Sequence, residues 1–122
     1  RPIRWLVDDA LKFVKREARR GARYDAIVMD PPSFGRGPKG EVWKFAESFP
    51  PLLAACVGLL SAQPLFVLVT AYALDASALA LGNLLSDVLG AEHKKITAGE
   101  LALREKAAGR LLSTALYGYW AG

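Results

Sequence analysis

The stretch from Tyr24 to Phe34, which reads YDAIVMDPPSF, constrains the fold more than any other part of the sequence. Ile27, Val28 and Met29 form a short apolar run with β-branched members, which is typical of a strand covered on both faces. Two prolines follow. Because proline donates no ladder hydrogen bond and disfavours helical backbone before it, the strand must end there. The sequence therefore predicts Asp30 at the carboxyl end of a buried strand, which is the edge at which open α/β sheets bind ligands.

The segments on either side alternate between strand-like and helix-like patterns. We expect further strands at residues 3–7, 65–70, 93–103 and 110–120. We expect helices at residues 10–20, 51–60 and 75–89, and a short helix at 41–47, with the second main helix starting near its two prolines. This order predicts an α/β fold, a doubly wound and mostly parallel sheet with helices on both faces, closed by a C-terminal antiparallel hairpin.

The composition fits one folded domain in a reducing compartment such as the cytoplasm. The 122 residues are 52% hydrophobic, which is enough for a packed core. The net charge of +4 is compatible with a polyanionic partner but does not require one. Cys56 is the single cysteine and excludes an internal disulfide. Apolar stretches are broken well short of the ~20 residues that a membrane span needs. The strand-like start directly after Arg1 suggests that the sequence begins inside a larger protein.

The Asp30–Phe34 corner is the strongest candidate for a site. A carboxylate and a proline-flanked carbonyl can accept hydrogen bonds from a substrate amine or a base edge, and Phe34 offers a face for stacking a planar base. A plain strand-ending turn is the alternative, but the position at the ligand edge of an α/β sheet favours a functional site. Asp9 and Ala10 follow the first expected strand. Alone they read as a helix cap, yet at the same sheet edge the carboxylate could accept from a purine amine.

Other chemistry-bearing residues give weaker signals. The glycine-rich loop at residues 35–40 lacks the spacing of a phosphate-binding P-loop. His93 is the only histidine, so no histidine-based metal site or triad can be assembled. The tryptophans are expected to be packing or rim residues; they are Trp5, Trp43 and Trp120.

These motifs resemble class I S-adenosylmethionine-dependent methyltransferases, which have a Rossmann-like doubly wound sheet with a reversed last hairpin. Asp9-Ala10 is similar to the acidic element after the third strand of that family, and Asp30–Phe34 to the Asn/Asp-Pro-Pro-aromatic element after the fourth. Four runs also look like a bacterial branch of ribosomal RNA large-subunit methyltransferases; they are residues 30–45, 70–73, 99–101 and 109–114. The resemblance covers essentially the whole chain but only the latter half of the catalytic domain. Residues 1–122 would then be a single partial domain that lacks the first two strands of the family fold.

The resemblance implies S-adenosylmethionine as cofactor. Asp9 would accept from the adenine amine, the Ala10 amide would meet the ring, and Asp30 would also face the cofactor. The glycine-rich cofactor loop and the ribose-binding acid of the family are missing from this sequence. We therefore expect the isolated chain to bind the cofactor weakly or not at all, and to be inactive without the missing N-terminal half of the domain.

The resemblance also implies ribosomal RNA as the substrate. Asp30 and the Pro31 carbonyl would line the methyl-transfer site, and Phe34 would orient the target base. The catalytic set would comprise Asp30, Pro31, Pro32 and Phe34. Arg36 and Lys39 are expected either to contact phosphate or to be solvated loop charges.

A nitrogen acceptor fits the sequence better than carbon. Related cytosine-C5 enzymes use a cysteine nucleophile, which some relatives place just after the fifth strand, where this sequence has Thr70-Ala71-Tyr72. Cys56 lies on the inward face of an expected helix and reads as an apolar core residue. Two alternatives remain open. One is an amino-group methyltransferase for DNA, protein or a small molecule, and the other is a non-catalytic α/β binding module.

Overall fold

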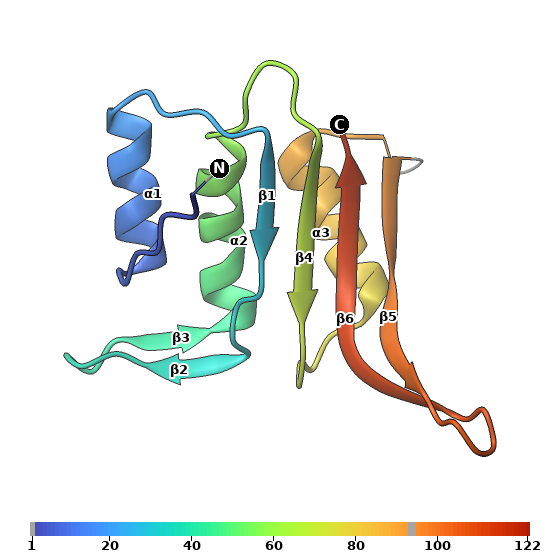
Figure 1. Cartoon of the computed structure of the whole chain (residues 1–122). Coiled ribbons are helices and arrows are strands. Elements are labelled where there is room, and N and C mark those ends of the chain that lie inside the picture. Colours follow the sequence, from blue (N-terminus) through green and yellow to red (C-terminus); the bar gives the residue numbers. More distant parts are fainter. Residues whose placement is uncertain (1, 93–94) are drawn as a thin grey trace.

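The computed structural model describes residues 2–92 and 95–122 (Figure 1). Its elements, in chain order, are α1 (Ala10–Arg19), β1 (Ala26–Met29), β2 (Phe34–Arg36), β3 (Val42–Lys44), α2 (Phe45–Val57), β4 (Phe66–Ala71), α3 (Ala78–Leu89), β5 (Ile96–Arg104) and β6 (Leu111–Ala121). Most of the expected helices and strands are confirmed to within a few residues. The first two residues of the strand expected at 93–103, His93 and Lys94, lie outside the described residues.

The main sheet has the strand order β1-β4-β6-β5. β1 and β4 are parallel, with Met29 opposite Val69, whereas β6 is antiparallel to both β4 and β5. The α/β class, the parallel pair and the closing antiparallel hairpin are therefore confirmed. A separate antiparallel hairpin, β2–β3, leaves the carboxyl end of β1 (Figure 1).

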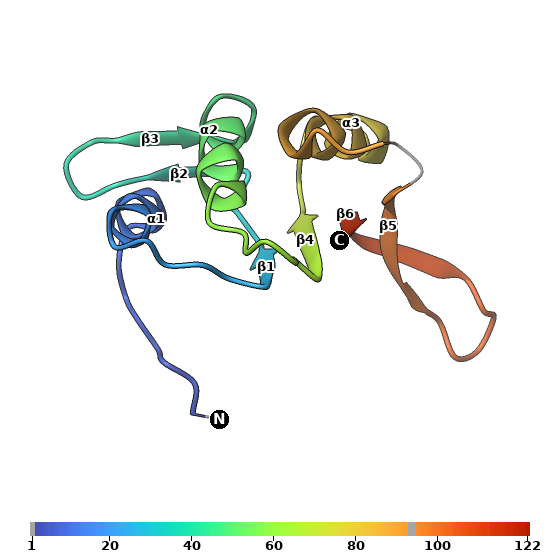
Figure 2. The ribbon, with the colours of Figure 1, turned by 90° about the horizontal axis from the view of Figure 1, so that it is seen from above.

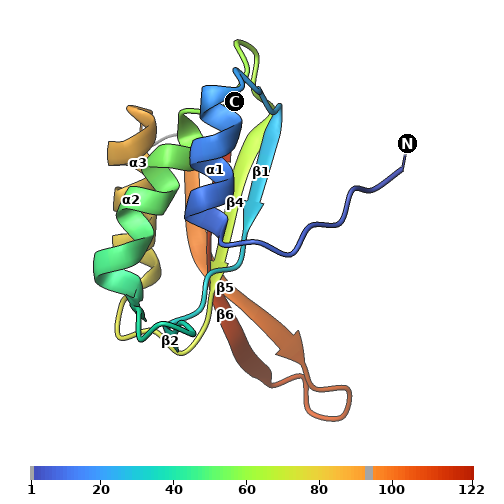
Figure 3. The same cartoon turned by 90° about the vertical axis from the view of Figure 1, so that its left-hand side faces the viewer.

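All three helices lie on one side of the sheet, with α1 beside α2, as Figures 2 and 3 show. The expectation of helices on both faces is therefore not met within this chain. The sheet explains the burial pattern: Val67 and Val69 of β4 point to the helices and are fully buried, whereas Val28 of β1 points to the bare face and is 65% exposed. Phe49 and Leu53 of α2 complete the core against these valines.

The predicted strand at residues 3–7 is wrong for this chain. The segment is extended but unpaired, it runs away from the sheet in Figures 2 and 3, and Trp5 is 84% exposed. A strand needs a neighbour to satisfy its backbone groups. Among the described residues β1 pairs with β4 and not with this segment.

The expected short helix at residues 41–47 is also wrong in part. Residues 42–44 form β3 instead, and one helix then runs through both prolines to Val57. Pro50 and Pro51 each remove a helical donor, but the stacked rings of Phe45 and Phe49, with centroids 4.6 Å apart, anchor this turn in the core. Within the described residues, no helix is long and apolar enough to cross a membrane.

Candidate functional site

The corner after β1 lies at the carboxyl edge of the β1–β4 pair. Extending the β1–β4 register by one residue brings Asp30 opposite Thr70, and Thr70 Oγ1 donates a hydrogen bond of 2.8 Å to Asp30 Oδ1. Asp30 is exposed and Pro31 is buried. The carboxylate is therefore presented at the predicted edge, and one of its oxygens has a fixed partner.

The β2–β3 hairpin holds the rest of the corner. Trp43 Nε1 donates to the Pro32 carbonyl at 2.6 Å, and the Phe45 amide donates to the Ser33 carbonyl at 3.1 Å. Across residues 2–92 and 95–122, no hydrogen bond ends on Asp30 Oδ2 or on the Pro31 carbonyl. Two neighbouring acceptors are thus left unpaired, one of them on a buried residue, where polar groups are normally satisfied.

Asp9 and Ala10 lie close to this corner. A hollow of about 410 Å³ is lined by Ala10, Asp30 and Pro31, together with apolar residues of β1, α1 and α2. A second hollow, of about 490 Å³, lies between Asp9 and the β2–β3 hairpin. It is lined by residues that include Asp9, Lys12, Pro32, Arg36, Lys39 and Trp43. The structure therefore gathers the predicted cofactor-side and substrate-side residues at one edge.

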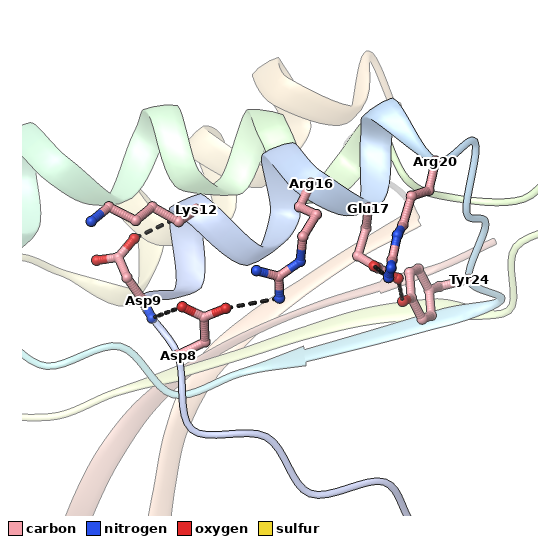
Figure 4. A network of polar contacts seen from close by, with 7 residues as sticks. All are labelled: Asp8, Asp9, Lys12, Arg16, Glu17, Arg20 and Tyr24. Carbon is pink, nitrogen blue, oxygen red and sulfur yellow. Dashed lines mark hydrogen bonds and ion pairs between the residues drawn. The ribbon is translucent and has the colours of Figure 1, made fainter.

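The start of α1 offers one acceptor and one donor. Asp9 caps the helix through a 2.9 Å hydrogen bond from the Lys12 amide to Oδ1 (Figure 4). This leaves Asp9 Oδ2 and the Ala10 amide without a partner in the part of the chain that the structure describes. The preceding residue, Asp8, pairs with Arg16 at 2.8 Å, and this hydrogen bond lowers the pKa of Asp8.

The predicted substrate residues flank the corner on the hairpin. Phe34 is 54% exposed, and the Arg36 guanidinium lies over its ring, 6.0 Å from the centroid. Phe34 also lines a hollow of about 330 Å³ with residues 73–76 of the loop after β4. In that loop Ala73 has a φ of 52°, which is rare for a residue with a Cβ. Lys39 is exposed at the hairpin loop.

Two residues that hold the corner were not assigned a site role from the sequence. Trp43 was expected to be a packing or rim residue. Thr70 was noted for its similarity to the methyltransferase branch and because it lies where some relatives have a nucleophilic cysteine. The alignment of β1 with β4 is the signal that could have found Thr70, because the last residues of two adjacent parallel strands meet at one edge. No local pattern identifies Trp43, whose partner is eleven positions away.

Cys56 lies on the buried side of α2 and lines the first hollow. Burial raises the pKa of its thiol to about 11. At pH 7 such a thiol is about one part in ten thousand thiolate, so it is a poor nucleophile.

We expect Cys56 to react slowly with iodoacetamide at pH 7 in the folded protein and rapidly in concentrated urea. Mass spectrometry of the alkylated peptide over time measures both rates. Labelling at similar rates with and without urea would show that the thiol is accessible and would contradict its assignment to the core.

A buried carboxylate outside the corner, Glu17 of α1, was not anticipated from the sequence. It accepts a 2.5 Å hydrogen bond from the Tyr24 hydroxyl and a 3.3 Å contact from Arg20 (Figure 4). The Tyr24 hydrogen bond, followed by the Arg20 interactions, lowers the pKa of Glu17, while desolvation opposes the shift. The contact ties α1 to the residues that lead into β1.

This network predicts an acid-sensitive contribution to stability. Because the pKa of Glu17 is lower in the folded state, its contribution is present above the unfolded value of 4.5 and disappears as the pH falls through the folded value. We expect Tyr24→Phe to reduce the free energy of unfolding at pH 7, and the difference from wild type to shrink below pH 4.5. Urea unfolding across this pH range measures the effect. A difference that stays constant with pH would contradict the role of the Glu17 carboxylate.

Comparison with known proteins supplies a relative for this geometry. The sequence matches no protein-family model and no curated protein. Among solved structures, a SAM-dependent methyltransferase from Agrobacterium tumefaciens aligns with a TM-score of 0.86 and 40% identity. The alignment covers 98% of this chain and 40% of the Agrobacterium protein.

Two further structures are more distant. SMU.776, assigned as a methyltransferase and crystallised with SAH, gives a TM-score of 0.66 and 20% identity. The alignment covers 94% of this chain and 30% of SMU.776. A precorrin 8W decarboxylase from Methanobacterium thermoautotrophicum gives a TM-score of 0.57 and 15% identity; the alignment covers 93% of this chain and 52% of the decarboxylase. These two share the fold alone, whereas the Agrobacterium protein also shares sequence. In all three, this chain spans less than two thirds of the relative.

Proposed function

We propose that the chain is the substrate-facing part of a class I S-adenosylmethionine-dependent methyltransferase, because it is related to such enzymes by sequence and fold. We further propose that the target of the enzyme is a nitrogen of a ribosomal RNA base. One observation carries the proposal. Asp30 Oδ2 and the Pro31 carbonyl are adjacent, unpaired acceptors at the carboxyl edge of the β1–β4 pair.

The residues at the start of α1 fit the adenine end of the cofactor. An adenine edge presents an amino donor beside a ring-nitrogen acceptor. Asp9 Oδ2 is an unpaired acceptor and the Ala10 amide is an unpaired donor, so the two groups complement that edge. S-adenosylmethionine would supply an electrophilic methyl group on sulfur. The glycine-rich loop at residues 35–40 follows β1 and belongs to the substrate side, so we propose that another part of the domain supplies the loop for the rest of the cofactor.

The corner is suited to hold an amine. The two hydrogens of an exocyclic amino group would donate to Asp30 Oδ2 and to the Pro31 carbonyl. These contacts would orient the nitrogen lone pair for in-line attack on the methyl group that S-adenosylmethionine would supply, with the thioether of the cofactor as the leaving group. The nitrogen then carries a positive charge, which the Asp30 carboxylate stabilises until the extra proton leaves to the carboxylate or to water. The barrier is lowered by positioning and by charge.

Nitrogen is favoured over carbon because carbon methylation of cytosine would need a covalent nucleophile. Cys56, the single cysteine, is buried and its pKa is raised to about 11. A nitrogen acceptor needs no covalent intermediate.

RNA is favoured by the residues around the corner. Phe34 is exposed beside the corner and can stack against a base, and Arg36 and Lys39 on the same hairpin can contact phosphate. The net charge of +4 has the sign that a polyanion requires. A ribosomal RNA substrate would also place the enzyme in the cytoplasm.

β1 is an edge strand of the main sheet, and this supports the proposal that further strands of the domain pair with it. Val28 is an apolar residue of β1 but is 65% exposed. The hollow of about 410 Å³ beside it is lined mainly by apolar residues. This chain covers only 40% of the Agrobacterium protein, so that protein has further residues that could form strands next to this edge. We propose that strands carrying the cofactor loop pair with β1 and separate it from residues 3–7.

The test is methyl transfer by the full-length protein. Purified protein would be incubated with methyl-tritiated S-adenosylmethionine and, in parallel reactions, unmodified ribosomal RNA transcripts, DNA and a cell protein extract. Labelled RNA would be digested to nucleosides and analysed by mass spectrometry. The proposal expects label in ribosomal RNA on an N-methylated base. Label found only in DNA or protein would overturn RNA as the substrate and support an amino-group methyltransferase for DNA or protein. A C5-methylated pyrimidine would overturn the nitrogen assignment.

A further inference from the structure

Two side chains outside the Asp30–Phe34 corner hold its polar atoms. Thr70, at the end of β4, donates to Asp30 Oδ1 at 2.8 Å, and Trp43, on β3, donates to the Pro32 carbonyl at 2.6 Å. The two donors come from different elements, and both are half-buried. The corner is therefore fixed from two directions by residues that are distant in sequence.

These hydrogen bonds are selective. They occupy one carboxylate oxygen and the second proline carbonyl, and they leave the other carboxylate oxygen and the first proline carbonyl unpaired. The terminal torsion of an aspartate is broad, so a carboxylate without a partner samples many orientations. One hydrogen bond from Thr70 decides which oxygen of Asp30 faces outward.

The Trp43 contact does the same for the backbone. Pro32 restricts the ψ of Pro31 to extended values, and within that range the direction of the Pro31 carbonyl depends on what holds the next peptide unit. The indole N–H of Trp43 holds that next unit through the Pro32 carbonyl. Functional groups need placement to within about 0.5 Å, which their supporting residues must provide.

We propose that Thr70 and Trp43 are positioning residues that aim Asp30 Oδ2 and the Pro31 carbonyl at the acceptor nitrogen. The inference rests on the proposed function, because it assigns these two acceptors to the substrate amine. Neither residue would touch the substrate or the cofactor; each acts through the atom that it holds.

For Thr70, two variants of the full-length protein separate shape from hydrogen bonding. Thr70→Val keeps the shape and loses the hydroxyl, whereas Thr70→Ser keeps the hydroxyl. We expect Thr70→Val to lower kcat roughly tenfold with the KM for S-adenosylmethionine within about twofold, and Thr70→Ser to retain most of the rate. Thr114→Val is the matched control, since Thr114 Oγ1 donates at 3.0 Å to the Leu101 carbonyl on the β5–β6 hairpin.

For Trp43, Trp43→Phe keeps an aromatic ring on β3 and removes the indole N–H. We expect a decrease of several-fold in kcat, again with little change in the KM for S-adenosylmethionine. Trp120→Phe is the control, because the buried Trp120 Nε1 has no hydrogen-bond partner within the described residues. Its kcat should equal that of the wild type.

Crystal structures of Thr70→Val and Trp43→Phe give a readout that does not depend on activity. The inference expects the Asp30 carboxylate to turn or to occupy more than one rotamer in the first, and the Pro31 peptide to turn in the second. An unchanged corner in both structures would overturn it, as would wild-type kcat in both variants. If the wild type methylates no acceptor, the proposed function fails, and the two structures still decide whether these residues position the corner.

Discussion

Replacing Asp30 with alanine is expected to reduce the rate of methyl transfer by the full-length protein by roughly 10²–10⁴-fold. The substitution removes the carboxylate that would accept from the amine and stabilise the charge developing on it. Because Asp30 is exposed and follows the last residue of β1, its loss should leave the fold intact. Initial rates with tritiated S-adenosylmethionine measure the effect, and urea unfolding confirms that stability is unchanged.

Asp87→Ala is the matched control for Asp30→Ala. Asp87 is an exposed aspartate on α3, away from the corner, so its rate should equal that of the wild type. An Asp30→Ala variant that transfers methyl groups at the wild-type rate would falsify the role assigned to this carboxylate. The corner would then be a plain strand-ending turn.

Replacing Phe49 with alanine is expected to lower the free energy of unfolding by about 3–5 kcal/mol. The Phe49 side chain is fully buried, packs in the cluster formed by α2, α3 and β4, and stacks on Phe45. Its removal leaves a cavity where α2 meets the sheet, and the two prolines in the helix depend on that contact. Urea denaturation followed by circular dichroism measures the change.

Leu79→Ala provides the control for the core substitution. Leu79 is on α3 but is 77% exposed, so its truncation should change the free energy of unfolding by less than about 0.5 kcal/mol. Equal losses for the two variants would contradict the assignment of Phe49 to the centre of the core.

The parts of the fold with strong local signals were predictable. β1 and β4 are short apolar runs ended by proline or polar residues, and Asp9, which reads as a helix cap in the sequence, caps α1. The failures came where pairing decides the structure. Residues 3–7 have a strand pattern, but no partner strand is present to pair with them. Residues 42–44 have no strong strand pattern, yet they pair with β2 across a glycine-rich turn.

The site was predictable to a similar extent. Asp30 and Pro31 were found because prolines mark the strand end, and Asp9 because helix caps follow strands at the same edge. The contacts that fix the corner could not be read from local sequence, since Thr70 lies forty positions from Asp30. Such contacts follow from strand register, which depends on the assembled sheet. The role of Asp30 is a prediction that the Asp30→Ala substitution tests, and the roles of Asp9 and Phe34 also remain predictions.

We propose that this chain carries the substrate side of a methyl-transfer site and lacks most of the cofactor side. Titration calorimetry with S-adenosylmethionine tests it most directly when residues 1–122 and the full-length protein are compared under one condition. We expect stoichiometric binding to the full-length protein and weak or undetectable binding to residues 1–122. Tight, one-to-one binding to residues 1–122 would contradict it.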